Sequence, residues 1–299
     1  MGPKSRPFAT QFGISILALS LSLVALTVGF WHLHTATTAS LPTSTSSVVP
    51  GLLERIERTG ELHAAYGVYP PYTMEDPNTK AVSGFSVEVI NHIASELKCR
   101  VVWHRMNWNT MSADLKRGEY DVIADPIFQT IPRAREFAFS APYAYFSDGI
   151  VVVGKNDNRF SKFDDLDAPN IRISVGLGWA SETLVKSRFT KATILPVQTS
   201  TDLLQVFNGV LAGRVDVAVA DGADAARFAR EHPSEVKVLF LNNPPAYFPA
   251  GFALRPDDRQ GADFLSESIR TLASTGTLGD LAKRYGIPSD QIESGHRSE

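Results

Sequence analysis

Two strand-like segments of the sequence end in an aspartate: YDVIAD ends at Asp125 and VDVAVAD ends at Asp221. In open α/β sheets, ligands bind beside the carboxyl ends of the strands, so both carboxylates are candidates for contact with a ligand. A carboxylate there can hold a cation, and Asp125 could also act as a general acid. The alternative for Asp221 is structural, because ADAARFA after it predicts a helix that an aspartate would cap.

A glycine-containing turn and one arginine could hold an anion. Residues 176–181 (GLGWAS) lie between a predicted strand and a predicted helix. Because Ser181 stands where a dinucleotide-binding fingerprint has its third glycine, we expect instead that N–H groups at the helix start face an anion. Arg133 carries the planar guanidinium that suits a carboxylate. From composition alone, it could equally be a surface residue of a cluster with Arg135 and Glu136.

Alternating strands and helices must position these residues. Strands LHAAYGV, CRVVWH and YDVIAD are separated by the helical patterns GFSVEVINHIASEL and NTMSADLKRG, the second ending at Gly118. In the first helix, Phe85, Val89, Ile93 and Leu97 recur every fourth position and form one apolar face. The alternation predicts an α/β fold with largely parallel sheets.

The same order of elements returns between residues 171 and 221, and it includes a helix predicted for residues 200–213 (STDLLQVFNGVLAG). LKRGEYDVIAD and LAGRVDVAVAD correspond most clearly, because each has a helix end, a glycine and an apolar strand between two aspartates. Such a duplication predicts two similar lobes. The last part, residues 261–286, predicts two helices separated at Gly276 and stopped at Gly286.

Composition excludes several classes of function. The 299 residues, 43% of them hydrophobic, suffice for about two domains. A net charge of -3 gives no global field toward nucleic acid. One cysteine, Cys99, excludes an internal disulfide, and the seven histidines have no metal-ligand spacing. We therefore expect no metal, no cofactor and no nucleic-acid partner.

The N-terminus predicts export. Lys4 and Arg6 precede an uncharged apolar run, residues 13–31, which is long enough to span a bilayer. We expect residues 1–34 to be a signal peptide or membrane anchor and residues 35–51 to be a Ser/Thr/Pro linker. Both alternatives place the rest in the periplasm or outside the cell, either free or anchored to the inner membrane.

Five short motifs follow one another between about Leu52 and Ile287. They are YGVYPPYTM from residue 66, GFSVE from residue 84, a W-x6-L-x2-G-x-Y-D segment over residues 108–121, T-x-x-R followed by F-S-x-P-Y over residues 130–143, and GTLGDLAKRYG from residue 276. Together they resemble the family 3 periplasmic solute-binding proteins, which bind polar amino acids for ABC importers.

The resemblance implies a type II periplasmic-binding-protein fold. Two α/β lobes, each a mixed, mostly parallel sheet flanked by helices, would be joined by crossovers near residues 151–153 and 243–246. Lobe one would comprise residues 52–152 and 246–290, lobe two residues 153–245, and residues 291–299 would be a disordered tail. The lobes would close on a ligand between them by a hinge motion.

The resemblance also implies roles for charged groups and for a helix start. Arg133 would bind a ligand carboxylate and Asp221 a ligand ammonium. The turn with Trp179 and Ala180 would direct backbone N–H groups at the carboxylate. Asp125 would add a negative charge beside the crevice.

Aromatic residues would form apolar walls around the ligand side chain, although each could be an ordinary core residue. They are Tyr69, Trp108 and Phe128. The chain departs from the family pattern at residues 125–128 (DPIF), where relatives have a small residue, a glycine, a hydrophobe and a hydroxyl residue. The departure indicates a cationic, bulky or modified ligand.

The implied function is capture of an amino acid, or a related small zwitterion or carboxylate, by a monomer that delivers it to an ABC permease without chemistry. One alternative is an enzyme on the same scaffold, because relatives of the fold include cyclohexadienyl dehydratases and Asp125 could be its general acid. A second alternative is a membrane-tethered sensor, which is disfavoured because only about a dozen residues precede the apolar run.

Overall fold

The computed structural model describes residues 49–200 and 202–292. The predicted signal peptide or anchor, most of the linker and most of the C-terminal tail lie outside the described residues. Among those that are described, no helix combines the length and the apolar character needed to cross a membrane.

The first of two large sheets has six strands in the described chain, and its strand order is β4-β1-β5-β13-β6, with β7 also paired to β13. Strands β4 and β5 run parallel to β1 on either side of it, whereas β13 is antiparallel to its three partners. The strands are β1 (Glu61–Tyr66), β4 (Arg100–Arg105), β5 (Val122–Phe128), β6 (Ala138–Phe139), β7 (Ala144–Asp148) and β13 (Ala246–Leu254).

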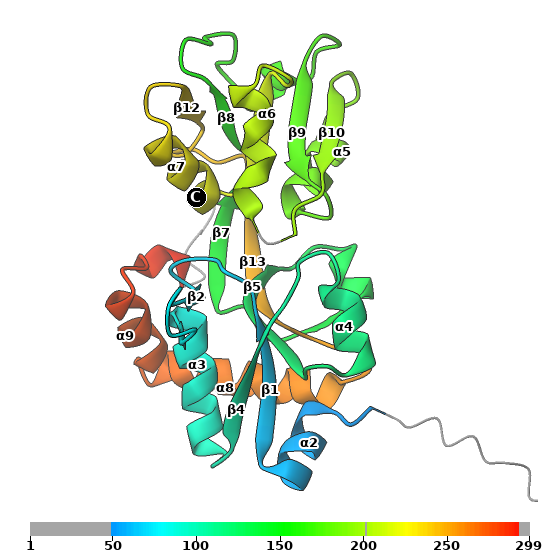
Figure 1. The fold of residues 1–299 in the computed structure, drawn as a ribbon, viewed down its shortest axis with the longest axis vertical. Helices are drawn as coiled ribbons and strands as arrows, with labels where there is room; N and C mark the ends of the chain where they lie inside the picture. The colour runs from blue at the N-terminus through cyan, green and yellow to red at the C-terminus, as the bar shows by residue number, and fades with distance from the viewer. Residues whose placement is uncertain (1–48, 201, 293–299) are drawn as a thin grey trace, which may run out of the picture. The chain divides into compact units, whose positions relative to one another are not determined.

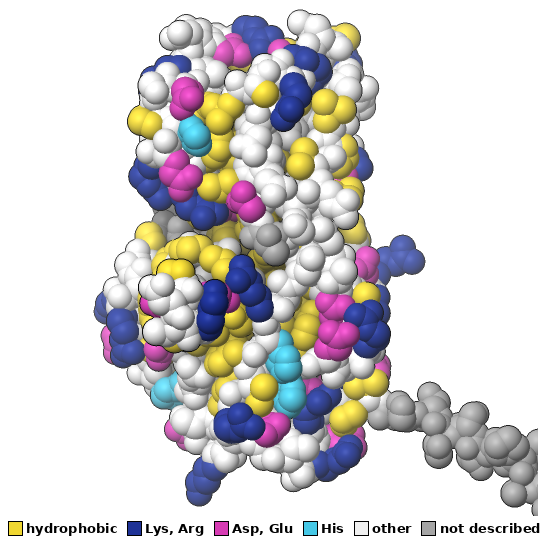
Figure 2. Space-filling view, in the orientation of Figure 1, with side chains coloured by type: hydrophobic (Ala, Val, Ile, Leu, Met, Phe, Trp, Pro, Cys, Tyr) yellow, Lys and Arg dark blue, Asp and Glu magenta, His cyan; other side chains and the backbone are white. Residues whose placement is uncertain are grey.

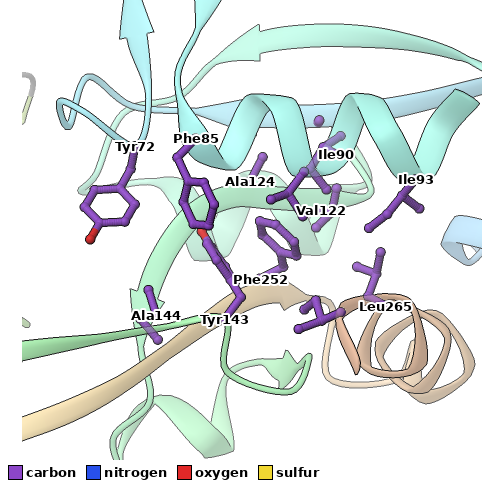
Figure 3. Close-up of a cluster of buried hydrophobic side chains, with 14 of the residues drawn as sticks. Tyr72, Phe85, Ile90, Ile93, Val122, Ala124, Tyr143, Ala144, Phe252 and Leu265 are labelled. Atoms are coloured by element: carbon purple, nitrogen blue, oxygen red, sulfur yellow. The ribbon is translucent and has the colours of Figure 1, made fainter. Parts of the chain in front are cut away.

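Helices from both ends of the described chain cover this sheet (Figure 1). Figure 3 shows the core that results, with Ile90 from one helix, Val122 and Phe252 from the sheet, and Leu265 from another helix meeting in one cluster. Because these side chains are almost fully buried, their packing fixes the helices to the sheet. The helices are α2 (Leu52–Thr59), α3 (Phe85–Glu96), α4 (Met111–Arg117), α8 (Arg259–Ser274) and α9 (Thr277–Arg284).

The second sheet has five strands in the described residues, in the order β10-β9-β11-β8-β12. Strands β10 and β11 are parallel to β9, and β8 is antiparallel to both β11 and β12. The elements are β8 (Ile150–Gly154), β9 (Arg172–Gly176), α5 (Ala180–Arg188), β10 (Thr193–Val197), α6 (Asn208–Leu211), β11 (Val217–Ala220), α7 (Gly222–Glu231) and β12 (Val236–Leu239).

The two sheets repeat one pattern. In each, the first strand of a cycle lies between the second and third strands, and an antiparallel strand pairs with the third: β4-β1-β5-β13 corresponds to β10-β9-β11-β8. The predicted α/β architecture of two mixed sheets is confirmed. The expectation that the sheets are mostly parallel is wrong for the described strands, because parallel pairings are two of five in the first sheet and two of four in the second. A small third sheet pairs β2 (Met74–Glu75) with β3 (Val82–Ser83).

The chain passes between the large sheets twice. It leaves the first sheet after Asp148 and enters the second at Ile150, with Gly149 between them at φ 80°. It returns between Leu239 and Ala246. The expected crossover at residues 151–153 falls inside β8, and the one at residues 243–246 overlaps the return. The expected division into residues 52–152 with 246–290 and residues 153–245 remains a prediction.

Two predicted elements differ from the structure. The helix predicted for residues 200–213 forms a 3-10 turn, Leu203–Phe207, followed by the single turn of α6. A glycine, Gly209, lies in α6 and packs closely against Val215, and glycine inside a helix is unfavourable. The strand predicted to end at Asp125 continues to Phe128, because β13 pairs with it as far as Ala250 opposite Phe128.

Candidate functional site

A cavity of about 60 Å³ lies between residues carried by the first sheet and residues carried by the second. A single water needs roughly 10–15 Å³ of such space, so the cavity has room for about four to six water-sized groups. Of the eight predicted site residues, only Asp125 does not line it. The seven that do are Tyr69, Trp108, Phe128, Arg133, Trp179, Ala180 and Asp221.

Asp221 caps a helix, as the structural interpretation predicted, and it also lines the cavity. Its Oδ1 caps α7 by accepting hydrogen bonds from the N–H groups of Ala223 at 2.9 Å and Asp224 at 3.0 Å. The same oxygen accepts a bond of 3.1 Å from the Tyr69 hydroxyl, which comes from the other side of the cavity. Burial raises the pKa of the Asp221 carboxyl above its usual value, and the bonds it accepts oppose that rise.

Arg133 lies on a short 3-10 turn, Arg133–Arg135, after β5. Its guanidinium donates to the carbonyl oxygens of Phe128 at 3.2 Å and Gly178 at 3.0 Å, so it joins the two sides of the cavity. Burial lowers its pKa to about 10, and the charge of Asp148 opposes that fall. Within the described ranges, Arg133 forms no ion pair with a carboxylate. Its charge is therefore available to an anionic ligand.

Helix α5 begins at the cavity. Trp179 is its N-cap residue, and its side chain makes no capping hydrogen bond, whereas Glu182 in the first turn accepts a bond of 2.6 Å from the Gly178 N–H. Position 176 must be glycine, because a Cβ there would lie 2.1 Å from the Trp179 ring. That the helix start faces an anion remains a prediction.

The aromatic walls also belong to the core. Phe128 stacks on Phe146 with ring centroids 4.8 Å apart, and Tyr69 contacts the same ring at 5.9 Å. Trp108 lies over Gly67, where a Cβ would meet the indole ring at 2.5 Å. Its backbone N–H donates to the carbonyl of Ser200 at 3.3 Å, on the side of the second sheet. These aromatic side chains therefore pack in the core and also line the cavity.

Asp125 lies outside the cavity, contrary to expectation. Its side chain is fully buried and accepts hydrogen bonds from the Gly67 backbone N–H and the Thr73 hydroxyl. Burial raises its pKa to about 7 against these two donors. The physical reason is that β5 continues past Asp125 to Phe128, and the strand residues that line the cavity are Pro126, Ile127 and Phe128, which follow it.

Two further aspartates line the cavity that sequence reasoning did not identify. Asp148 ends β7 and accepts a bond of 2.5 Å from the Gly149 N–H, and Asp224 lies in the first turn of α7. Burial, and then the negative charge of Asp221, raise the pKa of Asp224 to about 8; burial raises that of Asp148 to about 7. The spacing Asp221–Asp224 was a usable signal, because an N-cap residue and the residue three positions later lie close together at a helix start.

A larger groove of about 500 Å³ adjoins the cavity and shares Trp108, Arg133 and Trp179 with it. On the face seen in Figure 2, basic and acidic side chains are interspersed.

Among the described residues, no group of three or more histidine, cysteine or acidic side chains could hold a metal ion.

Comparison with known proteins gives consistent matches. The model of the bacterial extracellular solute-binding proteins, family 3, matches residues 63–288. A probable amino-acid ABC transporter-binding protein of Haemophilus influenzae is 28% identical over 82% of this chain and 92% of its own length. The cyclohexadienyl dehydratase of Pseudomonas aeruginosa is 25% identical over 60% of this chain and 66% of the enzyme.

A solved structure adds to these matches. An ancestral amino acid-binding protein, described as a precursor of cyclohexadienyl dehydratase, superposes with a TM-score of 0.67 at 26% identity. The match covers 79% of this chain and 99% of that one.

Proposed function

Because the chain belongs to the bacterial extracellular solute-binding proteins of family 3, we propose that it captures an amino acid in the cavity between its two sheets. The captured amino acid is delivered to the membrane permease of an ABC transporter. The observation that carries the proposal is that Arg133 and Asp221 line one cavity from opposite sides. An amino acid needs one partner for its carboxylate and another for its ammonium, since an unpaired buried charge is costly.

The carboxylate half of the proposal depends on Arg133. Its guanidinium has carbonyl partners at 3.0 and 3.2 Å and keeps its positive charge, so it can add an ionic bond to a bound carboxylate. The start of α5, without a side-chain cap at Trp179, can supply backbone N–H donors to the same group.

The ammonium half depends on Asp221. The hydrogen bonds from Tyr69 and from the start of α7 all end on Oδ1 and hold the carboxylate in one orientation. The other oxygen, Oδ2, then remains for an ammonium N–H donor. Tyr69 and Phe128 bring apolar surface to the same cavity, which suits the carbon atoms of a ligand.

Thermal unfolding in the presence of single amino acids tests the proposal. A ligand at a hundredfold excess over its Kd stabilises the folded protein by about 2.7 kcal/mol, which raises Tm measurably. Arg133→Ala should remove the shift for every amino acid that binds, because truncating a buried charged partner weakens binding roughly 30-fold or more. Arg135→Ala, an exposed neighbour on the same turn, is the matched control.

Two outcomes would contradict the proposal in different ways. If no amino acid raises Tm, capture of an amino acid is wrong. If Arg133→Ala keeps the shift while Arg135→Ala also keeps it, an amino acid binds but Arg133 does not hold its carboxylate.

The chain is proposed to act as a monomer outside the cytoplasmic membrane, either released or tethered by residues 13–31. Family membership supports the location. Sequencing the N-terminus of the mature protein distinguishes release from tethering, and size-exclusion chromatography of the purified protein tests the monomer.

An enzyme is the second candidate function. It is favoured by the dehydratase relative and by Asp148, a cavity carboxyl whose pKa of about 7 suits a proton donor at neutral pH. Asp125, the general acid considered from the sequence, has its carboxylate bound by Gly67 and Thr73 away from the cavity. Incubation with prephenate and arogenate tests this candidate: turnover that is lost in Asp148→Asn would favour it, and absence of turnover would reject it.

A further inference from the structure

The cavity contains more negative charge than a zwitterion can balance. Three aspartates line it: Asp148 from the end of β7, and Asp221 and Asp224 from the start of α7. All three are buried, with exposed fractions of 1%, 6% and 2%. Buried carboxylates are retained only where cations or donors compensate them.

Two arginines compensate part of this charge. Arg133 is the one basic residue among the described residues that line the cavity, and its charge interacts with that of Asp148. Arg227, outside the cavity lining, donates to Asp224 Oδ1 at 2.9 Å. With all three carboxyls ionised, two guanidinium groups leave one negative charge, and an amino acid without a charged side chain adds no net charge.

One oxygen marks where the excess is concentrated. Asp224 Oδ2 is buried and accepts from no donor group among the described residues; Oδ1 is paired with Arg227, and the other side chain within reach of Asp224 is a carboxyl, that of Asp221. Unpaired buried acceptors are rare, and each calls for a donor. An ammonium or guanidinium on the ligand side chain supplies such a donor together with the missing positive charge.

Without a bound cation, a proton on the neighbouring carboxyls reduces the negative charge of the cavity. Asp221 lies within hydrogen-bonding reach of Asp224, and its charge raises the pKa of Asp224 to about 8. The two carboxyls therefore hold a proton between them near neutral pH. Asp148 faces Arg133 and Asp221, and Tyr69 donates to Asp221. A cation that enters this group of charges takes the place of the proton.

We propose that the ligand is a cationic amino acid, with a second positive group on its side chain, and that Asp224 and Asp148 select it. This inference rests on the proposed capture of an amino acid. Asp221 then pairs with the α-ammonium and Arg133 with the carboxylate, while the side-chain cation satisfies Asp224 Oδ2.

Calorimetric titration of the full chain with matched ligands tests the inference. Arginine is compared with citrulline, and lysine with norleucine, because each neutral member has the shape of its partner without the side-chain charge. The cationic member of each pair should bind roughly 30-fold or more tightly, the effect expected for a buried charge pair. Cation binding at pH 7.5 should also release protons, seen as a binding enthalpy that depends on the ionisation enthalpy of the buffer.

Asp224→Asn keeps the shape of the side chain and removes its charge. It should reduce the preference for the cationic members at least about tenfold and remove most of the proton release. Asp148→Asn should also lower the preference. Asp280→Asn, whose side chain is 78% exposed on α9, is the control and should leave all of these values unchanged.

The outcomes separate the two proposals. If citrulline and norleucine bind as tightly as arginine and lysine, the selection of a cation is wrong and amino-acid capture stands. If no amino acid of either kind binds, both are wrong. The comparison of the matched ligands needs only the wild-type chain, so the inference can be refuted even if a variant does not fold.

Discussion

Replacement of Asp125 by asparagine would change how the stability of this protein depends on pH. The Asp125 side chain is fully buried and its burial raises its pKa from 3.8 to about 7. An elevation of this size corresponds to roughly 4 kcal/mol of preference for the protonated form in the folded state. Asparagine has almost the same shape and cannot ionise.

The sign of the effect follows from proton binding. Between about pH 4 and pH 7 the folded protein retains the Asp125 proton, whereas the unfolded chain releases it. The stability contributed by this group is therefore complete below pH 4 and is lost as the pH rises toward 7. The slope approaches about 1.4 kcal/mol per pH unit, and Asp125→Asn should remove it.

Urea unfolding followed by tryptophan fluorescence, at intervals from pH 4.5 to pH 8, measures this difference. Other buried carboxyls, such as Asp148 and Asp224, titrate in both proteins, so their contribution cancels when the two curves are subtracted. Ligand affinity should change less than about threefold, because Asp125 does not line the cavity. Equal slopes in the two proteins would refute the burial argument, and a large loss of affinity would refute the placement of Asp125.

Two further substitutions test the backbone and a helix end, both by urea unfolding. Gly84→Ala should lower the free energy of unfolding by about 3 kcal/mol or more, because φ is 127° and a Cβ would lie 2.3 Å from the Tyr72 carbonyl oxygen. At Gly60, where φ is also positive but a Cβ meets no neighbour, alanine should cost only about 1 kcal/mol, and equal costs would contradict the steric argument. Asp258→Ala should cost about 1–3 kcal/mol, because Asp258 accepts from the N–H groups of Gly261 at 3.0 Å and Leu52 at 2.7 Å. The control Asp263→Ala, at an exposed position of α8, should cost little, and a similar cost there would show that the two bonds are not the cause.

Helices with one apolar face could be predicted from the local spacing of apolar residues. The apolar positions Phe85, Val89 and Ile93 are all buried in α3, as their spacing predicted. Gly276 separates α8 from α9 with φ 78°, as expected for a glycine between helices.

Pairing between distant segments had no local signal. Strand β13 was not predicted, because what makes it a strand is contact with β5 and β7, more than a hundred and about a hundred residues earlier. The change of sheet at Gly149 depends on the same pairing and was expected a few residues later. Periodicity within a window cannot report such contacts.

Site residues that lie in a sequence motif could be predicted. Residues that only the fold brings to the cavity were missed. Arg133 and Asp221 line one cavity although 88 positions of sequence separate them. Asp125 was expected at the crevice because the predicted strand was too short. Asp148 was missed because it reaches the cavity only through the register of β7 against β13.

The position of β13 dictates an order of events during synthesis. All strands of the second sheet lie between Ile150 and Leu239, so that sheet can be complete while residues beyond it are still being made. The first sheet must wait for residues 246–254, and until then β5 has an open edge that could pair with another chain. At 5–20 residues per second, the interval from Phe128 to β13 is on the order of ten seconds. The part of the protein that begins first in sequence is thus the part that is finished last, and its exposed edge is the segment that chaperones or the export machinery would need to protect.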